Sequence, residues 1–232
     1  MTSSIHVYSE IGKLKTVMLN RPGKELENLS LEILNWMLID DIPYLKIAQK
    51  EHDYFAKTLQ KQGIHVVYLE NLLAESLESS KTRTAFIDQL LEESGIKKND
   101  PLNQLLMDYL LAMKPAEMVK QIIAGIKKSE IKNAEPSLAD LVEDPDYPFY
   151  LDPMPNVYFT RDQQAAIGNG MTINRMTFRA RRRESLFMET ILKHHPDFED
   201  QDIPVWRDRY HHGRIEGGDE LVLNKHVLAI GI

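Results

Sequence analysis

The chain has 232 residues, a hydrophobic content of 43% and a formal net charge of −7. This size and composition are typical of a globular protein with one large domain or two small ones. The acidic balance argues against nucleic acid as the main partner, because phosphate binding needs a basic face. The sequence shows no cysteine, no secretion signal and no apolar run of the roughly 18 residues that a membrane span needs. We therefore expect a cytoplasmic protein without disulfides or a membrane partner.

The first part of the chain predicts a β-α-β unit. Residues 17–19 are apolar and precede the turn signal of residues 20–23, which indicates a short strand and a turn. Residues 30–61 have helical spacing, Gly63 marks the end of the last helix, and residues 64–69 predict a buried strand. One helix face is expected to carry Leu45, Ala48, His52, Phe55 and Leu59.

Residues 71–144 differ in composition, because they are rich in leucine, glutamate, lysine and alanine and contain few strand signals. Four amphipathic segments follow one another, and each has apolar residues at helical spacing. Such stripes are packing surfaces rather than cofactor sites. The sequence predicts a small all-helical module inserted into an α/β chain.

An α/β pattern resumes at residue 146. Residues 183–194 predict a helix with Leu186, Phe187, Thr190 and Ile191 facing inward. Short apolar runs bounded by turn residues predict strands at 157–160, 165–167, 205–206, 221–223 and 227–230. The last two strands are separated by a turn and are expected to form a hairpin.

The motif MPNVYFTRD, residues 154–162, ends in a candidate ligand for a guanidinium group. A guanidinium is planar and always charged, so binding it away from water requires carboxylates in the plane of its N–H donors. Asp162 follows a predicted strand, and Arg161 would point to the opposite face of that strand. One of the two would then face a site and the other a structural neighbour. An ordinary surface ion pair is the alternative for both.

The motif RIEGGDE, residues 214–220, places Glu216 and Asp219 on either side of two glycines. Adjacent glycines mark backbone that bends or is closely approached, so these acids would converge. Converging carboxylates suit general acid–base chemistry. An ordinary acidic turn is the alternative.

Between the two acidic motifs lies ARRRE, residues 180–184. Its arginines could bind a substrate carboxylate in a bidentate way, or they could form a solvated helix N-terminus. A basic run is unfavourable at the positive end of a helix, so at least one arginine should have an anionic partner. Asn156 could bond an amino acid head group or belong to a turn. The adjacent pairs His194–His195 and His211–His212 do not have metal-ligand spacing, and no metal site is expected.

Taken in series, five segments resemble the bacterial arginine deiminases, in the pentein or guanidino-group modifying superfamily. The resemblance runs from about Ile5 to Ile232 and includes the helical module. The segments are SEIGKLKTVMLNRPGKELENL, IDDIPYLKIAQKEHDYFA, MPNVYFTRD, ARRRE and RIEGGDELVLNKHVLAIGI. The resemblance implies an α/β-propeller of β-β-α-β units, here incomplete. It also implies a hydrolase acting on the C–N bonds of linear amidines, which converts L-arginine to L-citrulline and ammonia without a cofactor.

The resemblance also assigns roles to individual residues. Asp162 matches an aspartate that grips the guanidinium, and Glu216 matches a glutamate that contacts it and orients the catalytic histidine. Arg181 and Asn156 match residues at the substrate's α-carboxylate, and Phe159 matches an aromatic side chain along the substrate. Asp219 completes the EGGD motif, where an architectural role is expected.

The same resemblance predicts an N-terminal portion only, with residues 1–70 as a first propeller unit, 71–145 as the helical insertion and 146–232 as further propeller strands. The family's catalytic histidine, second guanidinium-binding aspartate and nucleophilic cysteine would lie beyond Ile232. The chain alone is therefore expected to be inactive and to self-associate through an exposed propeller edge. The alternative is a non-catalytic arginine-binding or interaction module, or half of a split enzyme. An amidinotransferase or a dimethylarginine hydrolase is a third reading, which the helical insertion disfavours.

Overall fold

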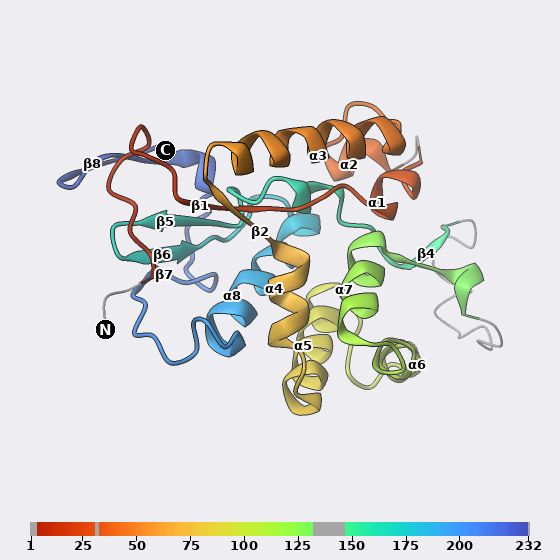
Figure 1. The fold of residues 1–232 in the computed structure, drawn as a ribbon. Coiled ribbons are helices and arrows are strands. Elements are labelled where there is room, and N and C mark those ends of the chain that lie inside the picture. The colour runs from red at the N-terminus through yellow and green to blue at the C-terminus, as the bar shows by residue number, and fades with distance from the viewer. Residues whose placement is uncertain (1–3, 31–32, 132–146, 232) are drawn as a thin grey trace.

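The computed structural model describes residues 4–30, 33–131 and 147–231, which combine helices with four small sheets (Figure 1). This arrangement confirms the mixed α/β class. The described elements that lie before residue 132 are β1 (Thr16–Leu19), α1 (Lys24–Glu27), α2 (Leu34–Met37), α3 (Leu45–Lys61), β2 (His65–Tyr68), α4 (Leu69–Ser76), α5 (Ser80–Glu93), α6 (Pro101–Leu111), α7 (Pro115–Ala124), β3 (Ile126–Lys127) and the 3₁₀ helix η1 (Lys128–Glu130). Those after residue 146 are β4 (Phe149–Leu151), η2 (Pro155–Tyr158), β5 (Gln164–Ile167), β6 (Gly170–Ile173), η3 (Arg179–Arg181), α8 (Glu184–His194), β7 (Val205–Arg207), η4 (Gly217–Asp219), β8 (Glu220–Asn224) and β9 (Val227–Ile230).

The predicted β-α-β unit is confirmed, because β1 and β2 pair in parallel and α3 lies in the connection between them. The expected buried face of α3 is wrong at Phe55, which is half exposed, whereas Leu45, His52 and Ala56 are buried. A helix turns about 100° per residue, so positions 45, 52 and 56 fall almost in line and position 55 falls about 80° away. Phe55 therefore lies beside the buried stripe.

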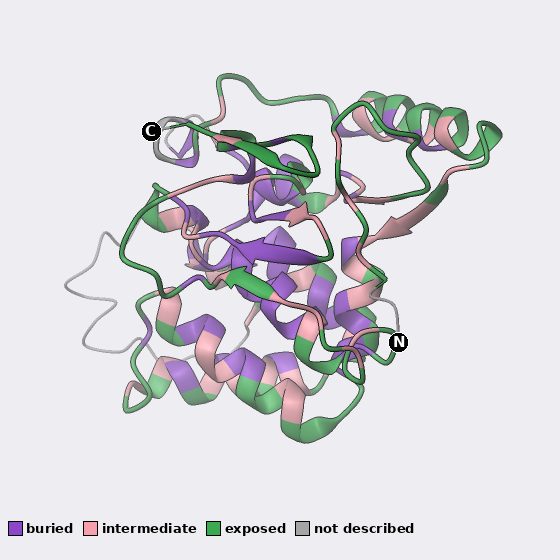
Figure 2. Ribbon diagram, turned by 90° about the vertical axis from the view of Figure 1, so that its left-hand side faces the viewer, coloured by how far each residue is buried: buried purple, intermediate pink, exposed green. Residues whose placement is uncertain are grey.

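The predicted helical run is present as α4 to α7, and its apolar stripes are buried (Figure 2). The core of these helices continues into α8, where the ring of Phe187 lies 5.9 Å from that of Phe86. Met154 and Val157 join the same core. A single apolar core thus connects the helical run to the segment that carries the acidic motifs. The division into three regions at 70 and 145 stays a prediction, and part of it, residues 132–146, lies outside the described residues.

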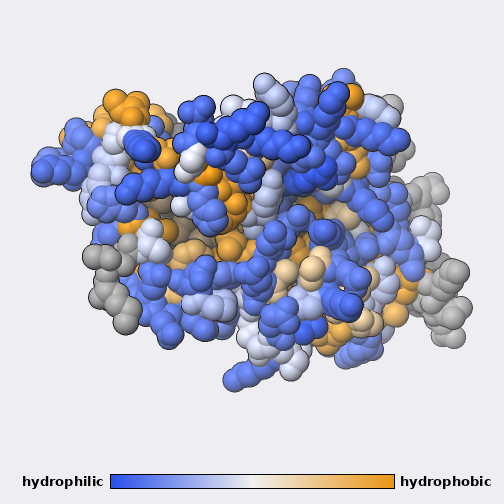
Figure 3. Space-filling model, viewed as in Figure 1, coloured by the Kyte–Doolittle hydropathy of each residue, from blue (hydrophilic) through white to orange (hydrophobic). Residues whose placement is uncertain are grey.

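The later strands form three small sheets among the described residues. Strands β5 and β6 form an antiparallel hairpin, and β7 pairs with β6 in parallel after the chain has passed through α8. Strands β3 and β4 pair antiparallel, as do β8 and β9 in the predicted terminal hairpin. This hairpin exposes apolar side chains at the end of the molecule where β8 lies, and hydrophobic atoms gather at that end in Figure 3. Its exposed apolar residues are Leu221, Leu223, Val227, Leu228 and Ile230.

The strand expected at residues 157–160 is wrong, because the segment starts as the 3₁₀ helix η2. Pro153 and Pro155 have no N–H to donate to a strand ladder, and proline is well suited to the first position of a helix. The N–H of Val157 instead bonds the Met154 carbonyl at 3.2 Å. Asp162 therefore sits in a compact turn and not at a strand end.

Among the described residues, no helix combines the length and the apolar composition that crossing a bilayer requires.

Glu25 in α1 is buried, and its carboxylate accepts a hydrogen bond from the Gly23 N–H at 2.6 Å. Burial raises the pKa of this carboxyl from 4.5 to about 6. The folded chain therefore holds this proton more tightly than the unfolded chain does. The stability contributed by neutral Glu25 is complete below pH 4.5 and is lost as the pH rises through 6.

Glu25→Gln keeps a neutral acceptor for the Gly23 N–H at every pH. We expect the variant to gain about 2 kcal/mol relative to the wild type between pH 4.5 and 7, since each pKa unit corresponds to about 1.4 kcal/mol. Urea denaturation of both proteins at the two pH values measures this difference. Glu27→Gln, at an exposed position of the same helix, controls for the loss of one charge. A difference between Glu25→Gln and wild type that does not change with pH would contradict the prediction.

Candidate functional site

Asp162 is held by backbone hydrogen bonds of its own turn and of the neighbouring sheet. Its N–H bonds the Phe159 carbonyl at 3.1 Å, and its carbonyl accepts from the Asn174 side chain at 3.1 Å. The carbonyl also accepts from the Gly217 N–H at 3.0 Å. The backbone at Asp162 is therefore joined directly to the loop that carries Glu216.

Glu216 is fixed by the turn that the EGGD motif forms. Its N–H bonds the Asp219 carboxylate at 3.1 Å, and its own carboxylate accepts from the Thr177 N–H at 3.2 Å. Asp219 is exposed and caps this turn, and its role at a substrate stays a prediction. Gly217 is so close to the Arg161 carbonyl that an added Cβ would lie 1.8 Å from that oxygen. The first glycine of the motif is therefore required for the approach of the two loops, whereas a Cβ on Gly218 would meet nothing within 4 Å.

The guanidinium of Arg181 lies between the two acidic loops. Its Nη2 is 3.1 Å from Asp162 Oδ2, and its Nη1 is 3.4 Å from Glu216 Oε2. The carboxylate of Glu184 is a third partner and binds the same guanidinium in a bidentate way. Arg181 Nε lies 3.1 Å from Glu184 Oε1, and Arg181 Nη2 lies 3.0 Å from Glu184 Oε2. The structure thus brings Asp162 and Glu216 together around one planar cation, the guanidinium of Arg181.

Burial and charge decide the protonation of this cluster. The Arg181 side chain is 7% exposed and that of Glu184 is 2% exposed. Burial works against the charge of Arg181, but Glu184 and Asp162 outweigh it and raise the pKa of the guanidinium. Burial raises the pKa of the Glu184 carboxyl to about 7, and Arg181 keeps it from rising further. Three carboxylates around one arginine leave an excess of negative charge that a second cation could neutralise.

The side chains of Arg161 and Asp162 bind different partners, as expected, although the two residues lie in a turn and not in a strand. Arg161 Nη2 pairs with Glu10 Oε1 at 2.9 Å, and its Nε donates to the Gly217 carbonyl at 2.9 Å. It also bonds the Glu220 carbonyl. Glu10 in turn accepts from the Val222 N–H at 3.0 Å. Arg161 therefore ties the N-terminal loop, the Asp162 turn and the EGGD loop together.

Two other candidate residues, Asn156 and Phe159, contact groups outside this cluster. Asn156 is buried, and its side-chain N–H donates to the Met37 carbonyl at 2.5 Å. Phe159 is half exposed, with its ring 5.3 Å from that of Tyr158. Their expected roles along the substrate, and the carboxylate-binding role of Arg181, stay predictions.

Sequence reasoning missed the part played by Glu184. The residue was visible as the last letter of ARRRE, three positions after Arg181, and residues so spaced face each other on a helix. That spacing is the signal that could have paired them. Among the described residues, no group of three or more histidines and acids is arranged to hold a metal ion.

A family model described as arginine deiminase matches residues 35–232. The chain is 60% identical over 232 residues to arginine deiminase of Limosilactobacillus reuteri and 56% identical to that of Latilactobacillus sakei. It is 53% identical over 233 residues to the Bacillus cereus protein of the same name. Each match covers 100% of this chain and 56% of the relative, so the chain spans about half the length of the curated relatives it matches.

Proposed function

Since the chain belongs to the arginine deiminase family, we propose that it supplies the guanidinium-binding carboxylates of an enzyme that hydrolyses L-arginine to L-citrulline and ammonia. One observation carries the proposal: Asp162 and Glu216 both bond the guanidinium of Arg181. The two acids come from distant loops and meet at a spacing that a flat, five-donor cation fills.

In this proposal the two carboxylates orient a substrate guanidinium and stabilise its positive charge. Attack on the guanidinium carbon by a cysteine thiolate would expel ammonia, and water would then release citrulline from the covalent amidino intermediate. The sequence of this chain contains no cysteine. The chain by itself would therefore bind the guanidinium and not hydrolyse it, and the nucleophile and catalytic histidine would come from sequence outside it.

The incomplete α/β-propeller belongs to the same proposal. The succession β5, β6, α8, β7 supports it, because this is one β-β-α-β unit with a hairpin followed by a helix and a parallel strand. The exposed apolar side chains of the β8–β9 hairpin favour the second candidate, a module that associates with another protein surface or with a second copy of itself.

The guanidinium site is tested by calorimetry with L-arginine on the full chain. We expect weak, saturable binding by the wild type and a loss of at least about tenfold in affinity for Asp162→Asn. The reason is that a hydrogen bond to a charged group contributes about 1.5–3 kcal/mol. Asp200→Asn, an exposed position, is the control for removing one negative charge. Equal binding by Asp162→Asn and the wild type would contradict the site, and citrulline release by the chain alone would contradict an external nucleophile.

A further inference from the structure

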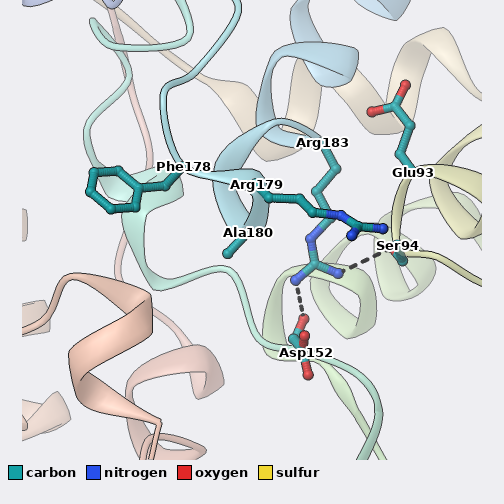
Figure 4. A pocket seen from close by; sticks show the side chains of 7 residues that line it. All are labelled: Glu93, Ser94, Asp152, Phe178, Arg179, Ala180 and Arg183. Carbon is teal, nitrogen blue, oxygen red and sulfur yellow. Dashed lines mark hydrogen bonds between the residues drawn. The ribbon is translucent and has the colours of Figure 1, made fainter.

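A pocket of about 350 Å³ lies outside the Asp162–Glu216 site, between the end of α5, the segment after β4 and the start of α8 (Figure 4). Its walls come from Glu93, Ser94, Asp152, Phe178, Arg179, Ala180 and Arg183. Arg181 belongs to the same short segment but does not line the pocket. Its guanidinium forms ion pairs with Asp162, Glu216 and Glu184. The basic segment thus presents arginines to two separate places.

Arg183 is a buried cation whose hydrogen-bond partners among the described residues are all neutral. Its side chain is almost fully buried, with the residue 4% exposed. It donates to Ser94 Oγ at 3.3 Å and to the carbonyls of Asp152 and Pro153 at 2.6 and 3.2 Å. Burial lowers the pKa of this guanidinium, and the nearby charges of Asp152 and Glu184 only partly offset the effect. A buried charge without a direct counter-ion is costly, so an anion at this position would be stabilised.

Arg179 adds a second cation to the same end of the pocket. Figure 4 shows the side chains of Arg179 and Arg183 both turned toward Ser94, and Arg179 Nη2 would lie 3.7 Å from a Cβ on the next residue, Gly95. Within the described part of the chain, neither arginine forms an ion pair with a carboxylate. Two neighbouring like charges repel, which again favours an anion between them.

The two acids in the pocket wall already have partners. Glu93 pairs with Arg209, and Arg209 also bonds Glu189. The Asp152 carboxylate accepts a hydrogen bond from the Tyr147 hydroxyl. Because tyrosine is neutral, Asp152 keeps a negative charge that no cation pairs directly, so two arginine charges in the pocket wall stand against this one carboxylate and the balance is positive.

We propose that this pocket binds a small oxyanion, a carboxylate or phosphate group, between Arg179 and Arg183. Guanidinium forks match the oxygen geometry of both groups and bind them in a bidentate way. The pocket extends to Ala180 and Phe178, which leaves room for an organic part of the ligand attached to the anionic head.

The test uses the full chain and two probes at constant ionic strength, inorganic phosphate and acetate. Each is followed by amide NMR shifts of residues 93–95 and 178–184. We expect saturable shifts with at least one probe, and the tighter of the two identifies the head group. Arg179→Gln should weaken that binding at least tenfold. The substitution is at an exposed side chain and should leave the fold intact.

Arg182→Gln is the matched control, since it removes a neighbouring arginine that does not line the pocket and that donates a hydrogen bond to the Met176 carbonyl. It should change the affinity less than twofold. Arg183→Gln should abolish the saturable shifts if the variant folds. If it does not fold, the Arg179→Gln result alone tests the site. The proposal is overturned if neither probe gives saturable shifts, or if Arg179→Gln and Arg182→Gln weaken binding equally.

Discussion

Alanine in place of Gly217 is expected to destabilise the chain by about 3 kcal/mol, at the upper end of the range for overpacked sites, and to remove its binding of L-arginine. The new Cβ would lie 1.8 Å from the Arg161 carbonyl oxygen and 2.9 Å from that of Gln164. Both neighbours are backbone atoms, so a side-chain rotation cannot relieve the clash. The loop that carries Glu216 would have to move away from Asp162, and the two carboxylates would no longer share a guanidinium.

Gly218→Ala is the matched control, because its Cβ would meet no atom within 4 Å. Urea denaturation measures the stability of both variants, and calorimetry measures their arginine binding. We expect the Gly218 variant to stay within about 1 kcal/mol of the wild type, in the range of a Gly→Ala change at a compatible position. If the two variants behaved alike, close packing at Gly217 would not be what brings the acidic loops together.

Glu184→Gln is expected to gain about 3 kcal/mol in the free energy of unfolding relative to the wild type between pH 4.5 and pH 8. Folding raises the pKa of the Glu184 carboxyl from 4.5 to about 7, so the wild type loses stability as the pH rises through this range, whereas the neutral glutamine does not. In the variant Arg181 keeps its bonds to Asp162 and Glu216. Urea denaturation of both proteins at the two pH values measures the difference.

The chain offers a control pair with the same geometry and a different burial. Arg21 and Asp53 also form a bidentate pair, with Nε and Nη2 at 2.7 and 3.0 Å from the carboxylate oxygens. Their side chains are 37% and 39% exposed, so Asp53→Asn is expected to cost less than about 1 kcal/mol. A Glu184→Gln difference from the wild type that stays as small as that of Asp53→Asn at both pH values would show that burial does not control the protonation of Glu184.

Most elements could be predicted where a local pattern was strong. The stripes of α4 to α7 and the hairpin of β8 and β9 were found because each buries one face or closes a short turn. The segment at residues 157–160 was assigned wrongly because its apolar residues suggested a strand, while Pro153 and Pro155 excluded ladder hydrogen bonds. Phe55 was misplaced because an apolar residue near a buried stripe was assumed to belong to it.

The sequence alone determined the family and which acids and arginines were candidates, since these follow from residue types in order along the chain. Only the tertiary structure decided which charges meet. Asp162 lies 19 residues before Arg181 and Glu216 lies 35 residues after it, yet both bond its guanidinium. Local spacing specifies only which residues share a face of a helix or strand. The contact between these charges depends on Gly217, which lets two backbone segments approach closely, and on the buried Glu184 carboxylate, which holds Arg181 between the two acids.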